Sequence, residues 1–295
     1  MATSFDLVTK FQPILDEIYK KASLTARMDA KTKPVSFGGA AVVEVFKTDV
    51  IGLGTYSRSS GYAEGQVQGS WETLTLATKR GRELGIDRMD NEETLGMAFG
   101  TVVGEFMRTE VVPEVDAYRF AKYASWGGIS KVAAAATLAS GTVLAAIDAA
   151  GLQLDEDEVP AEGRLLFVSS TVNKFIQAAI TRMLSNESSV DRRVQTLDNM
   201  TIIPVPQTRF YTAIDLDAGA TVDAGGYAKG GSAKDINFMM IHPSAVLQVT
   251  KHAKLKIFDP DINQDADKYK VQYRLYHDAF VYENKVDGIY LHNKA

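Results

Sequence analysis

The longest helical pattern in the chain lies between residues 80 and 123. Its apolar positions recur at the spacing of one helix face: Leu95, Phe99, Val102, Val103 and Phe106. Asp90 followed by Glu93 indicates a capping box at the start of the helix. Pro113 indicates its end and suits the first turn of a following helix. The pattern predicts a helix of about 20 residues, about 30 Å long, that serves as a structural spine.

Three glycines run along this predicted helix beside the apolar stripe. Gly96, Gly100 and Gly104 follow one another at intervals of four residues. A glycine inside a helix costs about 1 kcal/mol relative to alanine. We therefore expect another backbone to pass close to this side of the helix.

The pattern near the N-terminus changes from helix to strand. Residues 4–22 are amphipathic at helical spacing, and the small, polar residues 23–40 predict an extended arm. Residues 42–53 and 67–78 are rich in β-branched residues or contain aromatic residues among threonines, and the glycines between them indicate turns. The sequence therefore predicts a long two-stranded hairpin.

The outer half of this hairpin has few apolar residues to bury: Tyr56, Tyr62 and Val67. An isolated hairpin is only marginally stable in water. We therefore expect the hairpin to lie on a neighbouring subunit. The alternative is a floppy surface loop, since long loops in compact domains are usually either functional or disordered.

The remainder of the chain mixes the two element types. Helices are predicted at residues 142–152, 171–184 and 244–251. Strands are predicted at residues 164–168, 200–205, 236–241, 253–258, 269–276 and 280–292. The glycine-rich residues 218–234 predict a mobile loop. This mixture predicts an α+β fold with strands on both sides of a helical centre.

Composition narrows the range of functions. The 295 residues carry a net charge of −5, whereas a nucleic-acid reader usually has a basic face. The lack of cysteine excludes disulfides, thiolate metal sites and a cysteine nucleophile. We find no signal-peptide pattern at the N-terminus and no apolar run long enough to cross a bilayer. These features predict a protein of a reducing compartment that does not enter a membrane.

The histidines do not have the spacing of a catalytic or metal centre. They are His242, His252, His277 and His292. None fits a zinc-binding motif such as HExxH, so we interpret them as surface or packed side chains. His277 and Asp278 are neighbours on a predicted strand, where successive side chains point to opposite faces. We therefore do not expect them to form an acid–base pair.

Two glycine-containing segments only begin known motifs. Gly128-Ile129-Ser130 starts a nucleophile elbow, but Val132 occupies the place of the second glycine. Residues 225–234, GGYAKGGSAK, lack the spacing that brings a lysine to the phosphates in a P-loop. We interpret residues 225–234 as part of the flexible loop.

The strongest cluster of potential oxygen ligands consists of Asp259, Asp261, Asn263, Asp265 and Asp267. Its first three members match positions 1, 3 and 5 of a calcium-binding loop. However, Gln264 and Lys270 replace the turn glycine and the bidentate glutamate of such a loop. We interpret the segment as a polar turn between two strands. The sequence thus predicts no catalytic residue, no metal and no cofactor.

Three segments resemble the major capsid proteins of tailed bacteriophages, whose fold encapsulin shells share. They are GTYSRSSGY with TLATKRGRELGIDRMDNEET, EFMRTEVVPEVDAYRFAKY, and KLKIFDPDINQDADKYKVQYRLYHDAFVYENKVDGIYLH. These segments cover the predicted hairpin, the spine and the C-terminal strands, whereas residues 142–234 resemble the family only in layout. The resemblance implies an α+β, HK97-like phage capsid fold.

The resemblance implies a division into parts. Residues 1–40 would form an N-terminal arm, and residues 41–80 an extended hairpin loop (E-loop). Residues 81–138 would form a peripheral domain with the spine helix, to which residues 241–295 return. Residues 139–240 would form an axial domain.

The resemblance also implies a structural, non-enzymatic subunit. Such subunits self-assemble as pentamers and hexamers into the icosahedral shell of a virion, in the host cytoplasm, and enclose double-stranded DNA without reading its sequence. Scaffolding, portal and decoration proteins are the further partners that the resemblance allows. Some family members cross-link their shells through a hairpin lysine. Residues 48–78 contain Arg58 but no lysine, so we do not expect this cross-link.

We predict inter-subunit contacts for five residues: Phe5 and Phe11 on the arm, and Arg58, Tyr62 and Trp71 on the hairpin. Local packing is the alternative for Trp71 and the two phenylalanines. Two other functions stay open. One is an encapsulin-like shell around a cargo enzyme. The other is a metal-dependent enzyme that uses residues 259–267 and His277.

Overall fold

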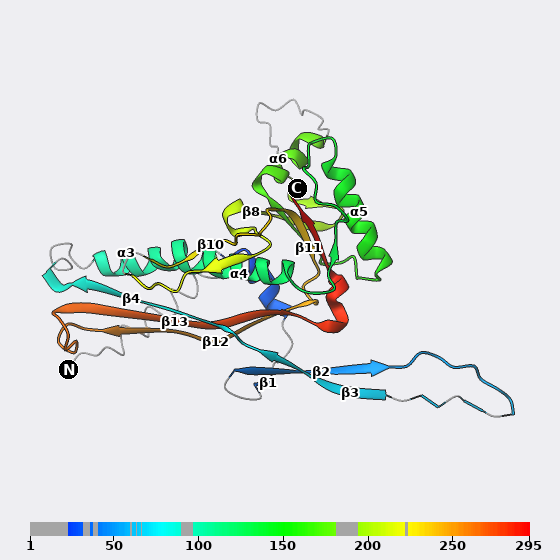
Figure 1. Cartoon of the computed structure of the whole chain (residues 1–295), viewed down its shortest axis with the longest axis horizontal. Helices are drawn as coiled ribbons and strands as arrows, with labels where there is room; N and C mark the ends of the chain where they lie inside the picture. Colours follow the sequence, from blue (N-terminus) through cyan, green and yellow to red (C-terminus); the bar gives the residue numbers. More distant parts are fainter. Residues whose placement is uncertain are drawn as a thin grey trace.

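The computed structural model describes residues 23–31, 36–37, 41–59, 61–62, 64–65, 67–89, 97–180, 194–221 and 224–295. Within these ranges the strands form four sheets, of three, two, six and three strands. Helices lie against two of the sheets, and a two-stranded arm runs out past the rest of the chain (Figure 1). The α+β fold class predicted from the sequence is confirmed.

The predicted spine is one continuous helical stretch of three parts. These are α3 (Met97–Phe106), the π-helical segment η2 (Met107–Val111) and α4 (Val112–Ala124). The sequence predicted that the helix ends at Pro113, but the helix continues through this residue. The N–H of Val112 bonds to the carbonyl of Met107, five residues back, so the widened π turn accommodates a residue that lacks an N–H. The capping box at Asp90 and Glu93 lies outside the described residues.

A long three-stranded sheet lies along the spine, in the order β12–β13–β4 (Figure 1). Its strands are β12 (Val246–Phe258), β13 (Lys268–Val281) and β4 (Thr78–Asp87). One face of the sheet packs on the spine through a buried cluster: Val103, Met107, Val111, Val115, Leu255, Ile257, Val271, Tyr273 and Leu275. This packing fixes which face of the sheet points away from the helix.

Two sequence predictions fail in this sheet. Residues 244–251, predicted as a short helix, supply most of the first half of β12, because pairing with β13 and burial of Val246, Leu247 and Val249 outweigh local preference. Residues 78–87 were not predicted as a strand, yet they pair with β13 over their whole length. In the first case the partner is the next strand along the chain, and in the second it lies more than 180 residues away.

A six-stranded sheet forms the upper lobe, in the order β5–β14–β11–β6–β8–β7. Its strands are β5 (Ser130–Lys131), β14 (Ile289–Asn293), β11 (Ile236–Ile241), β6 (Leu165–Ser169), β8 (Met200–Val205) and β7 (Thr196–Leu197). Helices α5 (Val143–Glu156) and α6 (Ser170–Ala179) pack on the face that carries Leu166 and Val168. Helix α4 packs on the opposite face, against Leu165 and Phe167. The predicted strand 280–292 is interrupted by the 3-10 helix η4 (Glu283–Gly288).

The N-terminal part forms the remaining three-stranded sheet, β1 (Ser36–Phe37), β2 (Val42–Val50) and β3 (Val67–Thr75). Strands β2 and β3 pair in register from Val42 with Thr75 to Val50 with Val67, which confirms the predicted hairpin. The arm expected to be extended contains a 3-10 helix, η1 (Thr25–Lys31), whose Met28 joins the core of the upper lobe.

The loop expected at residues 218–234 contains a short strand. It is β10 (Tyr227–Lys229), which pairs with β9 (Ile214–Leu216), and the 3-10 helix η3 (Gln207–Arg209) precedes the two strands. Among the residues described, no helix has the length and apolar character needed to cross a membrane.

Candidate inter-subunit surfaces

The base of the hairpin is packed on the outer face of the long sheet. Val43, Leu74 and Leu76 form a buried cluster with β12 and β13 residues: Leu247, Val249, Tyr276 and Phe280. The N–H of Leu76 donates to the carbonyl of Ala41, and Tyr276 donates its hydroxyl to the carbonyl of Leu76 at 3.1 Å. These contacts hold the start of the hairpin rigidly on its own subunit.

Beyond its base, the hairpin exposes an aromatic pair. Phe46 and Trp71 are opposite each other in the β2–β3 register, with ring centroids 5.1 Å apart, and they are 56% and 60% exposed. Because side chains alternate along a strand, this pair points away from the face that buries Val43 and Leu74. The ring of Phe46 also covers Gly69, where an added Cβ would lie 2.6 Å from Phe46 Cζ. The outward face of the hairpin therefore carries an aromatic pair that the described chain leaves exposed.

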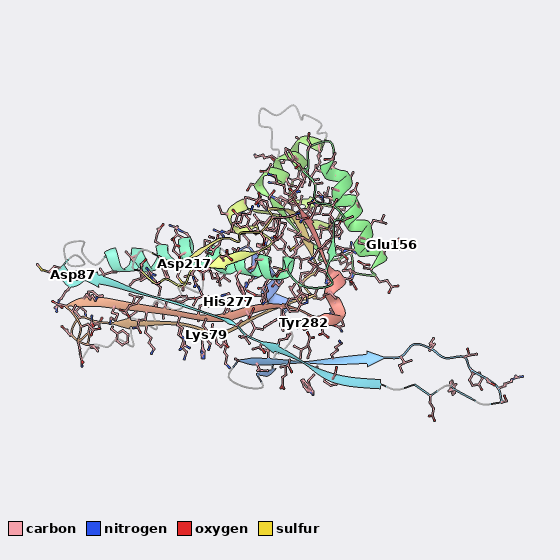
Figure 2. All side chains as sticks on the ribbon, viewed as in Figure 1. Lys79, Asp87, Glu156, Asp217, His277 and Tyr282 are labelled. Carbon is pink, nitrogen blue, oxygen red and sulfur yellow. The ribbon has the colours of Figure 1, made fainter. Side chains whose placement is uncertain are left out.

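The hairpin tip also exposes apolar side chains. Its exposed large hydrophobic residues are Ile51, Leu53, Tyr56 and Tyr62, and they lie among exposed polar residues such as Arg58 and Glu64. The rings of Tyr56 and Tyr62 contact each other at 4.9 Å, and a backbone bridge between Ser57 and Gly61 closes the turn. Figure 2 shows the tip running past the rest of the described chain. Large exposed apolar patches usually mark interaction sites, so we take the hairpin as the main candidate contact surface.

The structure locates three of the five predicted contact residues. Arg58, Tyr62 and Trp71 are exposed on the hairpin, whereas Phe5 and Phe11 lie outside the described residues. Their contacts with other subunits stay a prediction. Sequence reasoning missed Phe46, although the period-two pattern of strand 42–50 could have placed it on the face of Trp71.

A buried carboxylate fixes η1 on the spine. Asp116 of α4 is fully buried and accepts hydrogen bonds from Ser23 Oγ at 2.8 Å and Thr25 Oγ1 at 2.7 Å. Arg209 adds an ion pair at 3.4 Å, and Arg119 donates to Thr25 Oγ1 at 2.8 Å. A buried charge needs such partners because desolvation is otherwise costly. The network anchors residues 23–31 to the body of the subunit.

The sequence analysis interpreted the histidines as surface or packed side chains, and most of them are packed. His242, His277 and His292 are buried, and His252 is half-buried. Asp278 accepts hydrogen bonds from Tyr118 Oη and the N–H of Ala77, both at 2.8 Å, while His277 Nδ1 has no hydrogen-bond partner among the residues that the structure describes. His277 and Asp278 therefore do not form an acid–base pair.

The acidic segment 259–267 is the turn between β12 and β13. Its carboxylates contact cationic side chains: Asp261 and Asp267 lie 3.2 and 3.7 Å from Arg88, and Asp265 lies 2.7 Å from Lys270. In the described part of the chain, no group of three or more histidine and carboxylate side chains could hold a metal ion. The geometry is that of a charged turn.

The glycine-rich loop is tied down by two arginines of β4. Arg80 donates to the carbonyls of Asp217 and Gly226 at 2.6 and 3.1 Å, and Arg82 donates to that of Ala224 at 2.7 Å. Arg80 also binds both carboxylate oxygens of Glu114, which raises the pKa of the arginine. A phosphate cradle would present N–H donors, whereas these contacts turn carbonyl oxygens toward the arginines. The loop and β4 line a cavity of about 520 Å³ against the spine.

Comparison with known proteins gives a clear result for the fold alone. No protein-family model matches the sequence. No curated protein matches it either. The capsid structure of cyanophage P-SCSP1u is similar over 90% of this chain and 87% of that chain, with a TM-score of 0.60 and 14% identity. A Gordonia phage Cozz structure is similar over 94% and 86%, with a TM-score of 0.58 and 15% identity.

A third similar structure is a virus-like particle from Pyrococcus furiosus. The similarity covers 97% of this chain and 99% of that chain, with a TM-score of 0.57 and 10% identity. Each of the three matches covers at least 90% of this chain, so the similarity concerns the fold as a whole and not a single lobe. The chain therefore has the HK97-like capsid fold.

Proposed function

We propose, on the basis of this shared fold, that the chain is the major capsid protein of a tailed double-stranded DNA bacteriophage. The observation that carries the proposal is the near full-length similarity to phage capsid structures, which extends over 90% and 94% of this chain. In this role the chain is a structural, non-enzymatic subunit that self-assembles into an icosahedral head.

The hairpin supports this role physically. A two-stranded arm is only marginally stable in water by itself, and this arm leaves Phe46 and Trp71 exposed to solvent in an isolated subunit. Burial of apolar surface is worth about 25 cal/mol per Å², so a second copy that covers this face gains substantially. Head-to-tail contacts of this kind form closed assemblies when their rotation closes. Many modest contacts per copy then make dissociation rare.

The proposal includes the partners expected from the sequence. Pentamers and hexamers of the chain would form the shell, with residues 1–40 as arm, 41–80 as E-loop, 81–138 and 241–295 as peripheral domain, and 139–240 as axial domain. The net charge of −5 suits a container from which double-stranded DNA must be released, because a strongly basic lumen would hold the polyanion. The virion is the proposed location, with assembly in the host cytoplasm and with scaffolding, portal and decoration proteins as further candidate partners.

An encapsulin-like shell around cargo is the second candidate, because the virus-like particle from Pyrococcus furiosus matches over 97% of this chain. The two functions differ in contents. Double-stranded DNA protected from nuclease inside particles from the natural source supports the phage head. Particles that hold a protein cargo and no protected DNA support the alternative.

The hairpin tip provides the test of self-assembly. We expect replacement of residues 51–66 by a two-residue Asn-Gly turn to leave a folded, soluble subunit, because the base of the hairpin keeps its packing on β12 and β13. The variant should form no shells in negative-stain microscopy. Alanine at Ser57 and Ser59, two tip residues whose hydroxyls contact each other, is the matched control and should assemble. Normal shells from the shortened variant would refute the role of the hairpin.

A further inference from the structure

The face of the long sheet that points away from the spine is strongly basic. Residues paired across β12, β13 and β4 share a face, so Lys254 lies opposite Arg274, and Lys256 lies one position along on the same face. Lys79 of β4 joins them beside Tyr276, with its Nζ 5.2 Å from the ring centroid. All four cations are exposed. We call Lys79, Lys254, Lys256 and Arg274 the basic patch.

Within the described part of the chain, no carboxylate balances the charge of the basic patch. Among the described residues none of its four cations has an ion pair. The neighbour of Arg274 on β4 is Gly81, which offers no side chain. Glu83, on the same face, is already within 3.4 Å of Lys270 and bonded to Gln272 at 2.8 Å. Like charges directly opposite on paired strands destabilise a sheet, so the patch costs the isolated subunit stability.

Helix α5 carries a complementary surface. Asp148, Leu152 and Glu156 recur at intervals of four residues and therefore share one side of the helix. All three are exposed, Leu152 to 62%, and neither carboxylate has an ion pair in the described part of the chain. We call these three residues the acidic stripe. An exposed leucine flanked by two carboxylates without an ion pair is typical of a contact surface, which has an apolar centre and a polar rim.

The two surfaces are of similar size. On the sheet, Lys256, Lys254 and Lys79 lie in three successive rows of the same face, which span about 13 Å along the strands, and Lys79 on β4 lies two strand spacings, about 10 Å, to the side of β12. On the helix, Asp148 and Glu156 are separated by eight residues, about 12 Å. Figure 2 shows Lys79 on the long sheet and Glu156 at the end of α5, in different parts of the molecule. The two surfaces therefore do not meet within one copy.

We propose that the basic patch binds the acidic stripe of a second copy of this chain. The inference rests on the proposed self-assembly and names one contact within it. Opposite charges would meet at the rim of the contact, while Leu152 packs against the aliphatic stems of Lys254 and Arg274. Each subunit carries both surfaces, so the contact is head-to-tail and can close a ring. The two charge clusters that burden the free subunit then neutralise each other.

Charge reversal tests the pairing. The sheet variant carries Lys254→Glu and Arg274→Glu, the helix variant Asp148→Lys and Glu156→Lys, and the combined variant all four. We expect particle yield on a sucrose gradient to fall at least about tenfold in the sheet and helix variants and to return to within about threefold of the wild type in the combined variant. The matched control for the sheet variant is Lys131→Glu with Lys234→Glu. It makes the same change in net charge as the sheet variant at two exposed lysines outside both surfaces, and it should assemble.

The outcomes separate this inference from the proposed function. Failure of the wild-type chain to form shells contradicts the proposed function itself. If the wild type assembles, normal shells from the sheet variant overturn the inference, and so does a combined variant that stays unassembled. If the sheet variant forms normal shells that no longer hold DNA, the basic patch binds nucleic acid, and this result also overturns the inference. Circular dichroism of the dissociated subunits checks that each variant is folded.

Discussion

A single buried histidine links the stability of this subunit to pH. His277 of β13 is 1% exposed, and its ring packs on that of Tyr118 with centroids 5.3 Å apart. Burial, with the nearby charges of Arg119 and Arg80, lowers the pKa of His277 to about 3 from its ordinary value near 6.5. The folded state therefore holds this imidazole neutral where an unfolded chain would protonate it.

The sign of the effect follows from proton linkage. Above pH 6.5 both states are neutral at His277, and its contribution to stability is fully present. As the pH falls from 6.5 toward 3, the unfolded state binds the proton and the folded state does not. The free energy of unfolding then falls by up to about 1.4 kcal/mol per pH unit from this residue.

Replacement of His277 tests this linkage. Urea unfolding of dissociated subunits between pH 7 and pH 4 should give a free energy that falls less steeply with acidification in His277→Gln than in the wild type, by about one bound proton. The substitution also removes packing contacts of the imidazole ring, so the slope and not the absolute value is the readout. Equal slopes in the two proteins would contradict a neutral buried histidine.

For single residues, the sequence predicted exposure on the surface better than it predicted contacts with other residues. Trp71 and Tyr62 could be placed on an exposed hairpin because they alternate with polar residues between turn signals. The Asp116 network could not be predicted, since Ser23 and Thr25 lie more than 90 residues away in the chain. The separation of His277 and Asp278 followed from strand alternation, but the contacts of both residues with Tyr118 come from the packing of α4 on β13.

Among the elements, the hairpin has the most direct functional consequence. Trp71 is 60% exposed, so its loss removes little from the subunit beyond its contact with Phe46. If a second copy covers this face, the same loss acts on assembly. Stability and assembly should therefore respond differently to a substitution at Trp71.

Trp71→Ser separates these two effects. We expect the free energy of unfolding of the dissociated subunit to change by about 1 kcal/mol or less, and the concentration required for assembly to rise at least about tenfold. Light scattering during a dilution series measures the latter. The matched control is Ile262→Ser in the β12–β13 turn, at a residue 54% exposed, which should assemble as the wild type does. Equal effects of the two substitutions would contradict the hairpin contact.

The elements that the sequence predicted correctly are those with strong local signals. Strands β6, β8 and β11 were recognised as apolar runs, and α5 and α6 by their helical spacing. The failures are decided by pairing with another strand or by local geometry that a pattern does not encode. Residues 246–251 became strand through β13, and the spine continued past Pro113 through a π turn.

For the whole molecule, the quoted motifs were more informative than hydrophobic periodicity. Periodicity predicted an α+β mixture, whereas the resemblance in the hairpin, spine and C-terminal strands predicted the HK97-like fold. The order of strands could not be derived from either, because β13 pairs with β4 across more than 180 residues of chain. The division into five parts stays a prediction, and so do the inter-subunit contacts of all five residues: Phe5, Phe11, Arg58, Tyr62 and Trp71.

The central claim is that this subunit buries its outlying hairpin on other copies of itself. Cryo-electron microscopy of the purified full-length chain tests it most directly. We predict closed icosahedral shells in which the face of Phe46 and Trp71 lies against an adjacent subunit. A monodisperse monomer whose hairpin folds back on its own body would contradict the account.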